Sequence, residues 1–177
     1  LETSTSSPIS TLSDDPPPTG CGTAVDERFN ALYQQGAIIW GIDFSSRMLR
    51  QAKSRMPEGI FLLRDIAGGI PKEIQDRRFD AIVSSYAVHH IERLHLIAFL
   101  RDYLALLQPG GLLLIADIGF ETWRDHDSIK QQFASSWDDS ESYLIGDEIL
   151  SQLQPLGVSA HYTQISLCAG VLSVRNC

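Results

Sequence analysis

Between Ala37 and Ile118 the sequence alternates short apolar runs of strand length with longer segments in which apolar residues recur every three or four positions. The strand-like runs cover residues 37–42, 60–63, 79–85 and 112–118. The clearest helical segment lies between the last two runs, over residues 96–107. Strands that alternate with helices at this spacing build right-handed βαβ units. The pattern therefore predicts a doubly wound α/β domain around a parallel sheet.

The chain ends differently, on two strand-like runs over residues 158–164 and 171–174 that only a short segment separates. Antiparallel strands can be joined by a tight turn, whereas parallel strands need a long crossover connection. We therefore expect a hairpin at this point. The fold class that we predict is α/β, Rossmann-like and doubly wound, with a mostly parallel sheet and an antiparallel C-terminal strand.

Residues 1–19 are rich in Ser, Thr, Asp and Pro, and they include the tri-proline run Pro16–Pro18. Such a segment buries too little apolar surface to offset the entropy lost on ordering, and three prolines remove three backbone donors. We expect a flexible Ser/Pro-rich tail over residues 1–19. The remaining residues, 20–177, have the length of one ordinary domain.

The charge balance argues against a nucleic-acid partner. The chain has 14 basic and 22 acidic residues among 177, a formal net charge of -8, and this excess repels a phosphate backbone. A small-molecule ligand is the better expectation. The oligomeric state is not indicated.

The cysteines and the apolar runs bear on metal sites and on location. Cys21, Cys168 and Cys177 form no CxxC pair, so we expect neither a disulfide framework nor a metal site. Residues 1–20 resemble no signal or transit peptide, and no run is apolar enough to span a membrane. A cytoplasmic protein is expected.

Ligands of doubly wound sheets bind at the carboxyl ends of the strands. The turn Gly20–Ala24 (GCGTA) would let a ligand approach the backbone closely, although a plain surface loop is an equal alternative. Asp43 follows it by about 20 residues, where an acidic side chain accepts hydrogen bonds from ribose hydroxyls. The alternative for Asp43 is a cap on the helix that Ser45 begins. Asp65 follows the next strand-like run, either to accept a bond from an exocyclic amine or as an ordinary loop acid.

Five blocks of the sequence, in order, resemble the class I S-adenosylmethionine-dependent methyltransferases: GCGTA, GIDFSSRML, LLRDI, FDAIVSSYAVHHI and LQPGGLLLIADIGF. Their order and spacing are far more specific than any one block. The last two look like those of small bacterial methyltransferases. The resemblance implies that residues 20–177 form a methyltransferase-like domain whose cofactor is S-adenosyl-L-methionine.

The resemblance implies that the cofactor is bound by Gly20, Gly22, Asp43, Phe44, Met48, Asp65, Ile66, Ser84 and Ser85. Within this set the two glycines would face the methionine part of the cofactor, and Asp43 would hold the ribose. Met48 would pack near the adenine, whose polar edge the Asp65 carboxylate and the Ile66 amide would bind. The two serines and Tyr86 would lie beside the sulfonium.

Methyl transfer is an in-line displacement at an activated carbon, so alignment and the exclusion of water matter more than a dedicated base. The candidate catalytic residues are Tyr86, His89 and His90. Imidazole titrates near neutrality and can accept a proton, but a histidine pair at this position more often starts a helix and braces the site. Asp117 either orients the substrate or caps the next loop.

Residues 121–143 lie where this fold class places elements that cover the substrate. The segment contains Trp123, Phe133, Trp137 and Tyr143. These aromatic side chains either line a pocket or belong to the core.

The sequence departs from the family directly before the glycine turn, where an apolar strand ending in an acidic residue is normal. Residues 14–19 read DDPPPT, with Pro18 in the place of the acid, and Ala24 replaces the third glycine. Loss of this central strand would leave its neighbours without hydrogen-bonding partners. Three explanations remain open: the strand is supplied otherwise, the chain is a remnant that has lost strong cofactor affinity, or the second strand pairs directly with the fourth.

The function that the sequence favours is methyl transfer from S-adenosyl-L-methionine to an unidentified small molecule, without a metal. The alternative is a catalytically impaired methyltransferase-like module that binds a ligand or a partner. A nicotinamide-dependent reductase has the same layout, but the turn GCGTAV does not match GxGxxG, and no tyrosine and lysine follow the fourth strand at the required spacing.

Overall fold

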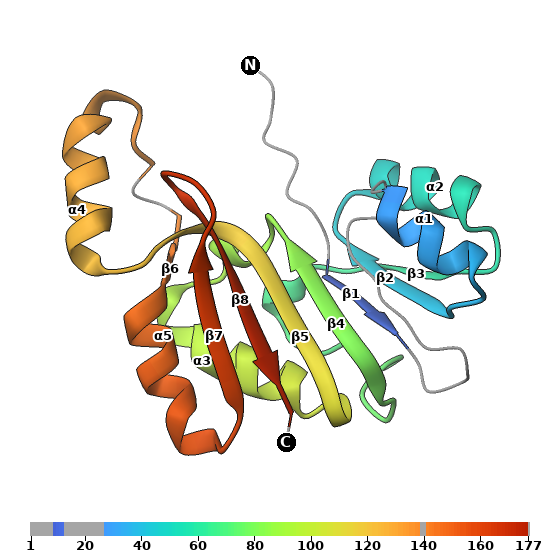
Figure 1. Cartoon of the computed structure of the whole chain (residues 1–177). Helices are drawn as coiled ribbons and strands as arrows, with labels where there is room; N and C mark the ends of the chain where they lie inside the picture. Colours follow the sequence, from blue (N-terminus) through green and yellow to red (C-terminus); the bar gives the residue numbers. More distant parts are fainter. Residues whose placement is uncertain (1–8, 13–26, 139–140, 177) are drawn as a thin grey trace.

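The computed structural model describes residues 9–12, 27–138 and 141–176 (Figure 1). Its strands and helices are β1 (Ile9–Leu12), α1 (Glu27–Gln34), β2 (Ile39–Asp43), α2 (Ser46–Arg55), β3 (Ile60–Leu63), β4 (Phe79–Ser85), α3 (Arg93–Leu104), β5 (Leu107–Phe120), α4 (Trp123–Gln132), β6 (Leu144–Ile145), α5 (Gly146–Leu153), β7 (Ser159–Gln164) and β8 (Ala169–Arg175). Single helical turns are η1 (Ile66–Gly68), η2 (Val88–His90), η3 (Ala134–Ser136) and η4 (Gln154–Leu156).

The strands form one sheet in the order β3-β2-β1-β4-β5-β8-β7, and the short β6 pairs with β5. β2 runs parallel to β3, and β4 runs parallel to β5. β8 is antiparallel to both β5 and β7. The predicted α/β fold, with a mostly parallel sheet and an antiparallel C-terminal strand, is therefore confirmed.

The centre of the sheet, between β2 and β4, is occupied by β1. β1 runs antiparallel to both neighbours, with Ile9 opposite Ile42 and Leu12 opposite Ile39. The expected flexible tail is thus wrong for residues 9–12, because the facing edges of β2 and β4 present backbone donors and acceptors that need a partner. Residues 9–12 therefore supply the central strand that the sequence pattern before the glycine turn lacks, and β2 does not pair directly with β4. The rest of the expected tail, with its three prolines, lies outside the described residues.

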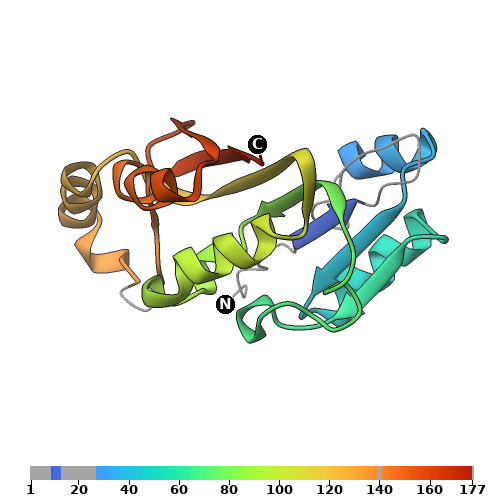
Figure 2. The ribbon, with the colours of Figure 1, turned by 90° about the horizontal axis from the view of Figure 1, so that it is seen from below.

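Side chains alternate along β2, so its two faces pack against different helices. Ile39 packs in a cluster with Phe29 of α1 and Ala52 of α2. Trp40 and Ile42 face the larger core, which also contains buried side chains of α3 and α5. Seen along the sheet, α3 lies against one face, while α4 lies at the far end of the molecule from α1 and α2 (Figure 2). Helices α1 and α2 thus cover one face of the sheet and α3 and α5 the other, which is the predicted doubly wound arrangement.

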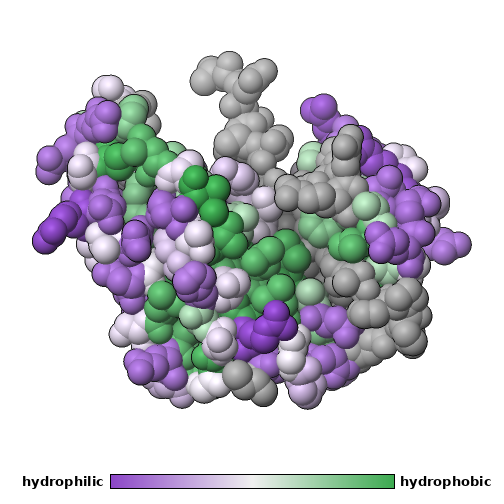
Figure 3. Space-filling model, in the orientation of Figure 1, coloured by the Kyte–Doolittle hydropathy of each residue, from purple (hydrophilic) through white to green (hydrophobic). Residues whose placement is uncertain are grey.

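The face of the sheet away from α3 carries apolar side chains that are only partly buried, among them Leu112, Leu114 and Val171. Apolar side chains gather over the middle strands on this face in Figure 3. None of the helices in the described part of the chain has the length and apolar character needed to cross a bilayer.

Candidate functional site

Asp43 ends β2 at the carboxyl edge of the sheet and is almost fully buried, with 2% exposure. Its Oδ1 accepts a hydrogen bond from the Ser45 amide, 2.7 Å away. Its Oδ2 is buried and has no hydrogen-bond partner among the described residues. Burial raises the pKa of Asp43 above the usual value, although the bond from Ser45 acts in the opposite direction.

The cap of α2 is Ser45 rather than Asp43. The Ser45 Oγ accepts from the Met48 amide at 3.4 Å, and Ser45 occupies the N-cap position. The alternative role of Asp43 as a cap is therefore wrong, and one of its oxygens remains for another purpose. Met48 itself is half-buried on the first turn of the helix.

Asp65 lies at the same edge of the sheet, two residues beyond the end of β3. β2 and β3 are parallel with Asp43 opposite Leu63, and the Arg64 amide donates to the Asp43 carbonyl at 3.0 Å. The Asp65 Oδ1 accepts from the Ala67 amide at 2.9 Å and so caps η1, whose first residue, Ile66, is buried. The two carboxylates thus follow adjacent strands, as predicted.

Large apolar side chains remain exposed at this edge. Phe44, which follows Asp43, is 57% exposed, and Leu63 at the end of β3 is 50% exposed. Exposed side chains of this size beside a buried carboxylate suit a ligand that has an apolar face and a polar edge.

The end of β4 contributes a second group of predicted residues. Ser84 is fully buried, and its Oγ has no hydrogen-bond partner among the described residues, while Ser85 is half-buried. Tyr86 is 46% exposed and has a φ of 49°, which makes it the one described residue other than glycine with positive φ. Left-handed backbone in a bulky residue is strained, and such strain concentrates at functional sites.

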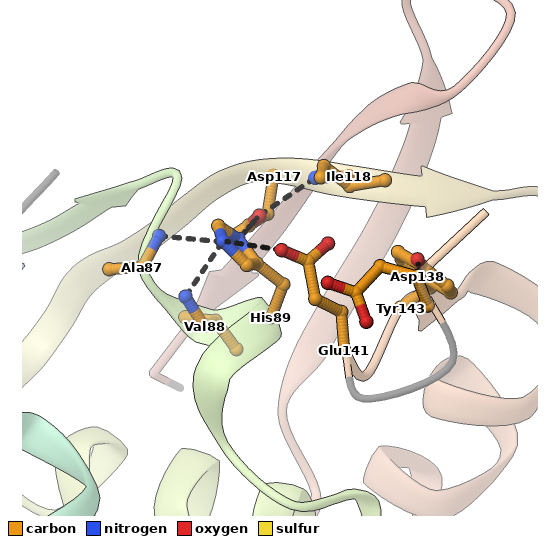
Figure 4. Close-up of polar contacts among 8 residues, drawn as sticks. All are labelled: Ala87, Val88, His89, Asp117, Ile118, Asp138, Glu141 and Tyr143. Atoms are coloured by element: carbon orange, nitrogen blue, oxygen red, sulfur yellow. Dashed lines mark hydrogen bonds and ion pairs between the residues drawn. The ribbon is translucent and has the colours of Figure 1, made fainter. Parts of the chain in front are cut away.

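Asp117, near the end of β5, organises the loop that follows β4 (Figure 4). Its Oδ2 accepts from the amides of Ala87 and Val88 at 2.9 and 2.7 Å. Its Oδ1 lies 2.6 Å from Nδ1 of His89 and also accepts from the Ile118 amide at 2.8 Å. Of the two roles considered for Asp117, capping of the next loop is wrong, since the loop that it binds precedes it in the chain.

The two histidines differ in environment. His89 is 5% exposed, and although burial alone would lower its pKa, the hydrogen bond and charge of Asp117 with the charge of Glu141 outweigh this and raise the pKa. His90 is more exposed, but the partial burial of its ring and the charge of His89 lower its pKa, against the charges of Glu141, Asp117 and Asp65. His89 therefore braces the loop from inside the protein, whereas the His90 ring is exposed to solvent.

Glu141 joins the histidines from a distant part of the sequence. Its Oε1 lies 4.0 Å from Nε2 of His89, and the Ser142 amide donates to the His89 carbonyl at 2.9 Å. The sequence gives no signal for this residue, because the segment around it is irregular and 51 positions separate it from His90. The glycines Gly20 and Gly22 lie outside the described residues.

The aromatic residues of the segment after β5 form a cluster rather than an open lining. Trp137 and Tyr143 pack against each other and against Phe120 and His126, with ring centroids 5.0 to 6.1 Å apart. Phe133 is instead 42% exposed.

A cavity of about 330 Å³ lies next to this aromatic cluster. Its lining comes from β5, α4 and the β7–β8 hairpin: Phe120, Glu121, Asp125, Ser128, Ile129, Gln164, Ser166 and Leu167.

Comparison with known proteins identifies one family. Residues 19–111, just over half of the chain, match the model of the methyltransferase domain family. Trans-aconitate 2-methyltransferase of Paracidovorax citrulli is 27% identical over 158 residues, which are 88% of this chain and 57% of that protein. An uncharacterised methyltransferase of Bacillus cytotoxicus is 31% identical over 99 residues, 56% of this chain and 45% of its own. The chain spans about half the length of the curated relatives that it matches.

Solved structures show the same fold. Magnesium protoporphyrin IX methyltransferase from Synechocystis PCC 6803, with bound SAH, has a TM-score of 0.61 at 16% identity and covers 83% of this chain and 68% of its own. The DhpI-SAM-HEP complex has a TM-score of 0.57 at 17% identity, covering 77% and 67%.

Proposed function

Because the chain belongs to the methyltransferase domain family, we propose that it binds S-adenosyl-L-methionine and transfers the methyl group of this cofactor to a small molecule. When bound, the cofactor supplies a methyl carbon that its positively charged sulfur makes reactive toward a nucleophile. One observation carries the proposal: the buried Oδ2 of Asp43 has no donor among the described residues. A buried carboxylate oxygen without a donor is costly, and a ligand hydroxyl would remove that cost.

The geometry of Asp43 suits a ribose. The bond from the Ser45 amide to Oδ1 fixes the carboxylate, so that Oδ2 is held in place before a ligand arrives. Asp43 also ends its strand at the carboxyl edge, where doubly wound sheets bind nucleotides. Two of the solved relatives contain SAM or SAH, which both carry this sugar.

The neighbouring residues suit an adenine. Phe44 and Leu63 offer apolar surface that a base would cover. The Asp65 carboxylate uses Oδ1 to cap η1, which leaves Oδ2 to accept from an exocyclic amine. Ile66, the first residue of η1, is held by this cap, and its backbone is thereby fixed beside the same edge.

The loop after β4 would position the reacting groups. Ser84 and Ser85 end the strand, and the strained backbone of Tyr86 sets the direction in which the chain leaves it. Asp117 then holds the next two amides and the His89 ring. Methyl transfer depends on close alignment of the reacting atoms, and a loop that Asp117 fixes at three points provides it. In this proposal Tyr86 and His90, which are both exposed, contact the substrate.

Isothermal titration calorimetry with S-adenosylhomocysteine, the demethylated cofactor, tests the proposal. The wild-type chain should bind one molecule. The variant Asp43→Ala should bind at least about tenfold more weakly, because it loses a hydrogen bond to a charged acceptor. Asp76→Ala, which removes an exposed carboxylate from the segment between η1 and β4, should bind as the wild type does. A folded wild-type chain that gives no binding heat, or equal affinities of all three proteins, would overturn the proposal.

A further inference from the structure

His89, His90 and Glu141 bring two imidazoles and one carboxylate together beside the loop after β4. One donor atom from each of the three side chains lies within 4.8 Å of the other two. The imidazole rings are tilted by 53° with centroids 4.1 Å apart, so they do not stack, and the Glu141 carboxylate approaches the His89 ring (Figure 4). We propose that these three residues bind a divalent transition-metal ion.

The orientation of His89 favours metal binding. Its Nδ1 is hydrogen-bonded to the Asp117 carboxylate, which can only accept, so in the neutral ring the proton sits on Nδ1 and Nε2 carries the lone pair. Nε2 is the atom that faces Glu141. A carboxylate that holds the far nitrogen of a histidine ligand is the usual outer support of metal sites in proteins. Asp117 and His89, which are both buried, form such a pair.

The carboxylate ligand is held by the backbone. The Ser142 amide donates to the His89 carbonyl at 2.9 Å, which fastens the segment carrying Glu141 to η2. Metal–donor bonds of 2.0 to 2.2 Å require donor atoms about 3.4 Å apart. The distances between the three donor atoms, which are at most 4.8 Å, must therefore shorten by roughly 1 Å when an ion binds. The Glu141 side chain is 21% exposed and His90 is exposed, so both can move this far without disturbing the core.

The ligand set indicates the kind of ion and its role. Two imidazoles and one carboxylate suit zinc and its neighbours in the first transition row, and three protein ligands leave a coordination position open. We assign the open position to an oxygen atom of the substrate, which makes the substrate an alcohol, phenol or carboxylate. This assignment of the substrate rests on the proposed methyl transfer, whereas the metal site itself does not.

The test is a titration of the chelator-treated full chain with Zn²⁺, followed by calorimetry, and with Co²⁺, followed by its visible absorption. The wild type should bind one ion of each. His90→Ala and Glu141→Gln should weaken binding by at least about tenfold, as loss of a ligand does. Both substitutions lie outside the core, so the variants should unfold at the wild-type temperature. His95→Ala is the matched control, because His95 is exposed and also lies beside a carboxylate, that of Glu92, at 3.6 Å.

Wild-type affinity in His90→Ala and Glu141→Gln, or no binding by the wild type, would overturn the proposed site. The result is separate from that for the cofactor. Metal binding without binding of S-adenosylhomocysteine contradicts only the proposed function, and cofactor binding without metal binding contradicts only the metal site.

Discussion

The Asp117 carboxylate and the His89 ring, 28 residues apart in the sequence, meet at 2.6 Å between Oδ1 and Nδ1 in the buried interior. The same carboxylate accepts hydrogen bonds from three backbone amides, two of which belong to the loop after β4. The candidate catalytic residues lie on this loop. The Asp117 side chain therefore fixes the loop to β5, the strand that contains Asp117.

Asp117→Asn should destabilise the protein strongly. An asparagine has one acceptor oxygen and would place its NH₂ group against backbone N–H groups, so buried donors lose their partner. We expect the free energy of unfolding to fall by about 3 kcal/mol, as for other buried networks. The midpoint of urea unfolding measures this loss.

Asp127→Asn is the control for that variant. Asp127 also binds a histidine, with its Oδ1 2.8 Å from Nδ1 of His126, but its side chain is 65% exposed. It should lose less than about 0.5 kcal/mol, as is usual for exposed pairs. Equal losses in the two variants would contradict the role given to Asp117.

Asp43→Asn should show the cost of a buried charge through its pH dependence. The pKa of Asp43 is higher in the folded state than in the unfolded chain, so the folded state binds the proton of this carboxyl more tightly. At neutral pH the ionised Asp43 is a cost that asparagine removes, while the asparagine oxygen can still accept from the Ser45 amide. Without a ligand, Asp43→Asn should therefore be more stable than the wild type at pH 7.

This advantage should shrink as the pH falls through the raised pKa of Asp43, because the wild-type carboxyl is then protonated in the folded state. Thermal unfolding of both proteins at a series of pH values provides the measurement. A difference in stability that does not change with pH, or one that grows toward acid, would show that Asp43 carries no such penalty.

Thr11→Pro should weaken the centre of the sheet. Thr11 lies in β1 opposite Trp40 on one side and Ile82 on the other. Proline cannot donate a backbone hydrogen bond and is excluded from central strands, so the unfolding free energy should fall by roughly 2 to 4 kcal/mol. Thr11→Val keeps the amide and should remain within about 1 kcal/mol of the wild type. If the proline variant unfolds at the wild-type denaturant concentration, β1 does not contribute its pairing in solution.

Substitutions of Tyr86 should separate backbone strain from side-chain contacts. Glycine adopts a φ of 49° readily, so Tyr86→Gly should change the unfolding free energy little or raise it by up to about 1 kcal/mol. A β-branched residue is poorly suited to that backbone, so Tyr86→Val should lose about 1 to 2 kcal/mol. Chemical unfolding of the two variants decides the matter, and a valine variant more stable than the glycine variant would contradict the assigned strain.

Local patterns in the sequence were enough to predict most of the fold. The limits of β3 and β4 coincide with the predicted apolar runs, and α2 begins at Ser45, its N-cap, as expected. The central strand was missed because its four residues have no apolar alternation of their own. Ile9–Leu12 joins the sheet because the backbone N–H and C=O groups on the facing edges of β2 and β4 need hydrogen-bonding partners. This need arises only in the assembled sheet and cannot be read from the segment itself.

The candidate site was predictable only where one strand end determines a position. Asp43 and Asp65 follow adjacent parallel strands, so spacing alone placed them at one edge. The partnership of His89 with Asp117, and the approach of Glu141 to both histidines, depend on contacts between segments far apart in the chain. For this reason the sequence indicated no metal site, whereas the structure supports a proposal for one.

The central claim is that Oδ2 of Asp43 accepts a hydrogen bond from the cofactor ribose. The most direct test compares the binding of S-adenosylhomocysteine and of its 2′-deoxyribose analogue to the wild type and to Asp43→Ala. The wild type should bind the deoxy analogue about tenfold more weakly, the size of one hydrogen bond to a charged acceptor, and Asp43→Ala should bind the two ligands within about twofold of each other. A wild type that does not distinguish the ligands, or an alanine variant that distinguishes them as strongly as the wild type, would contradict the account.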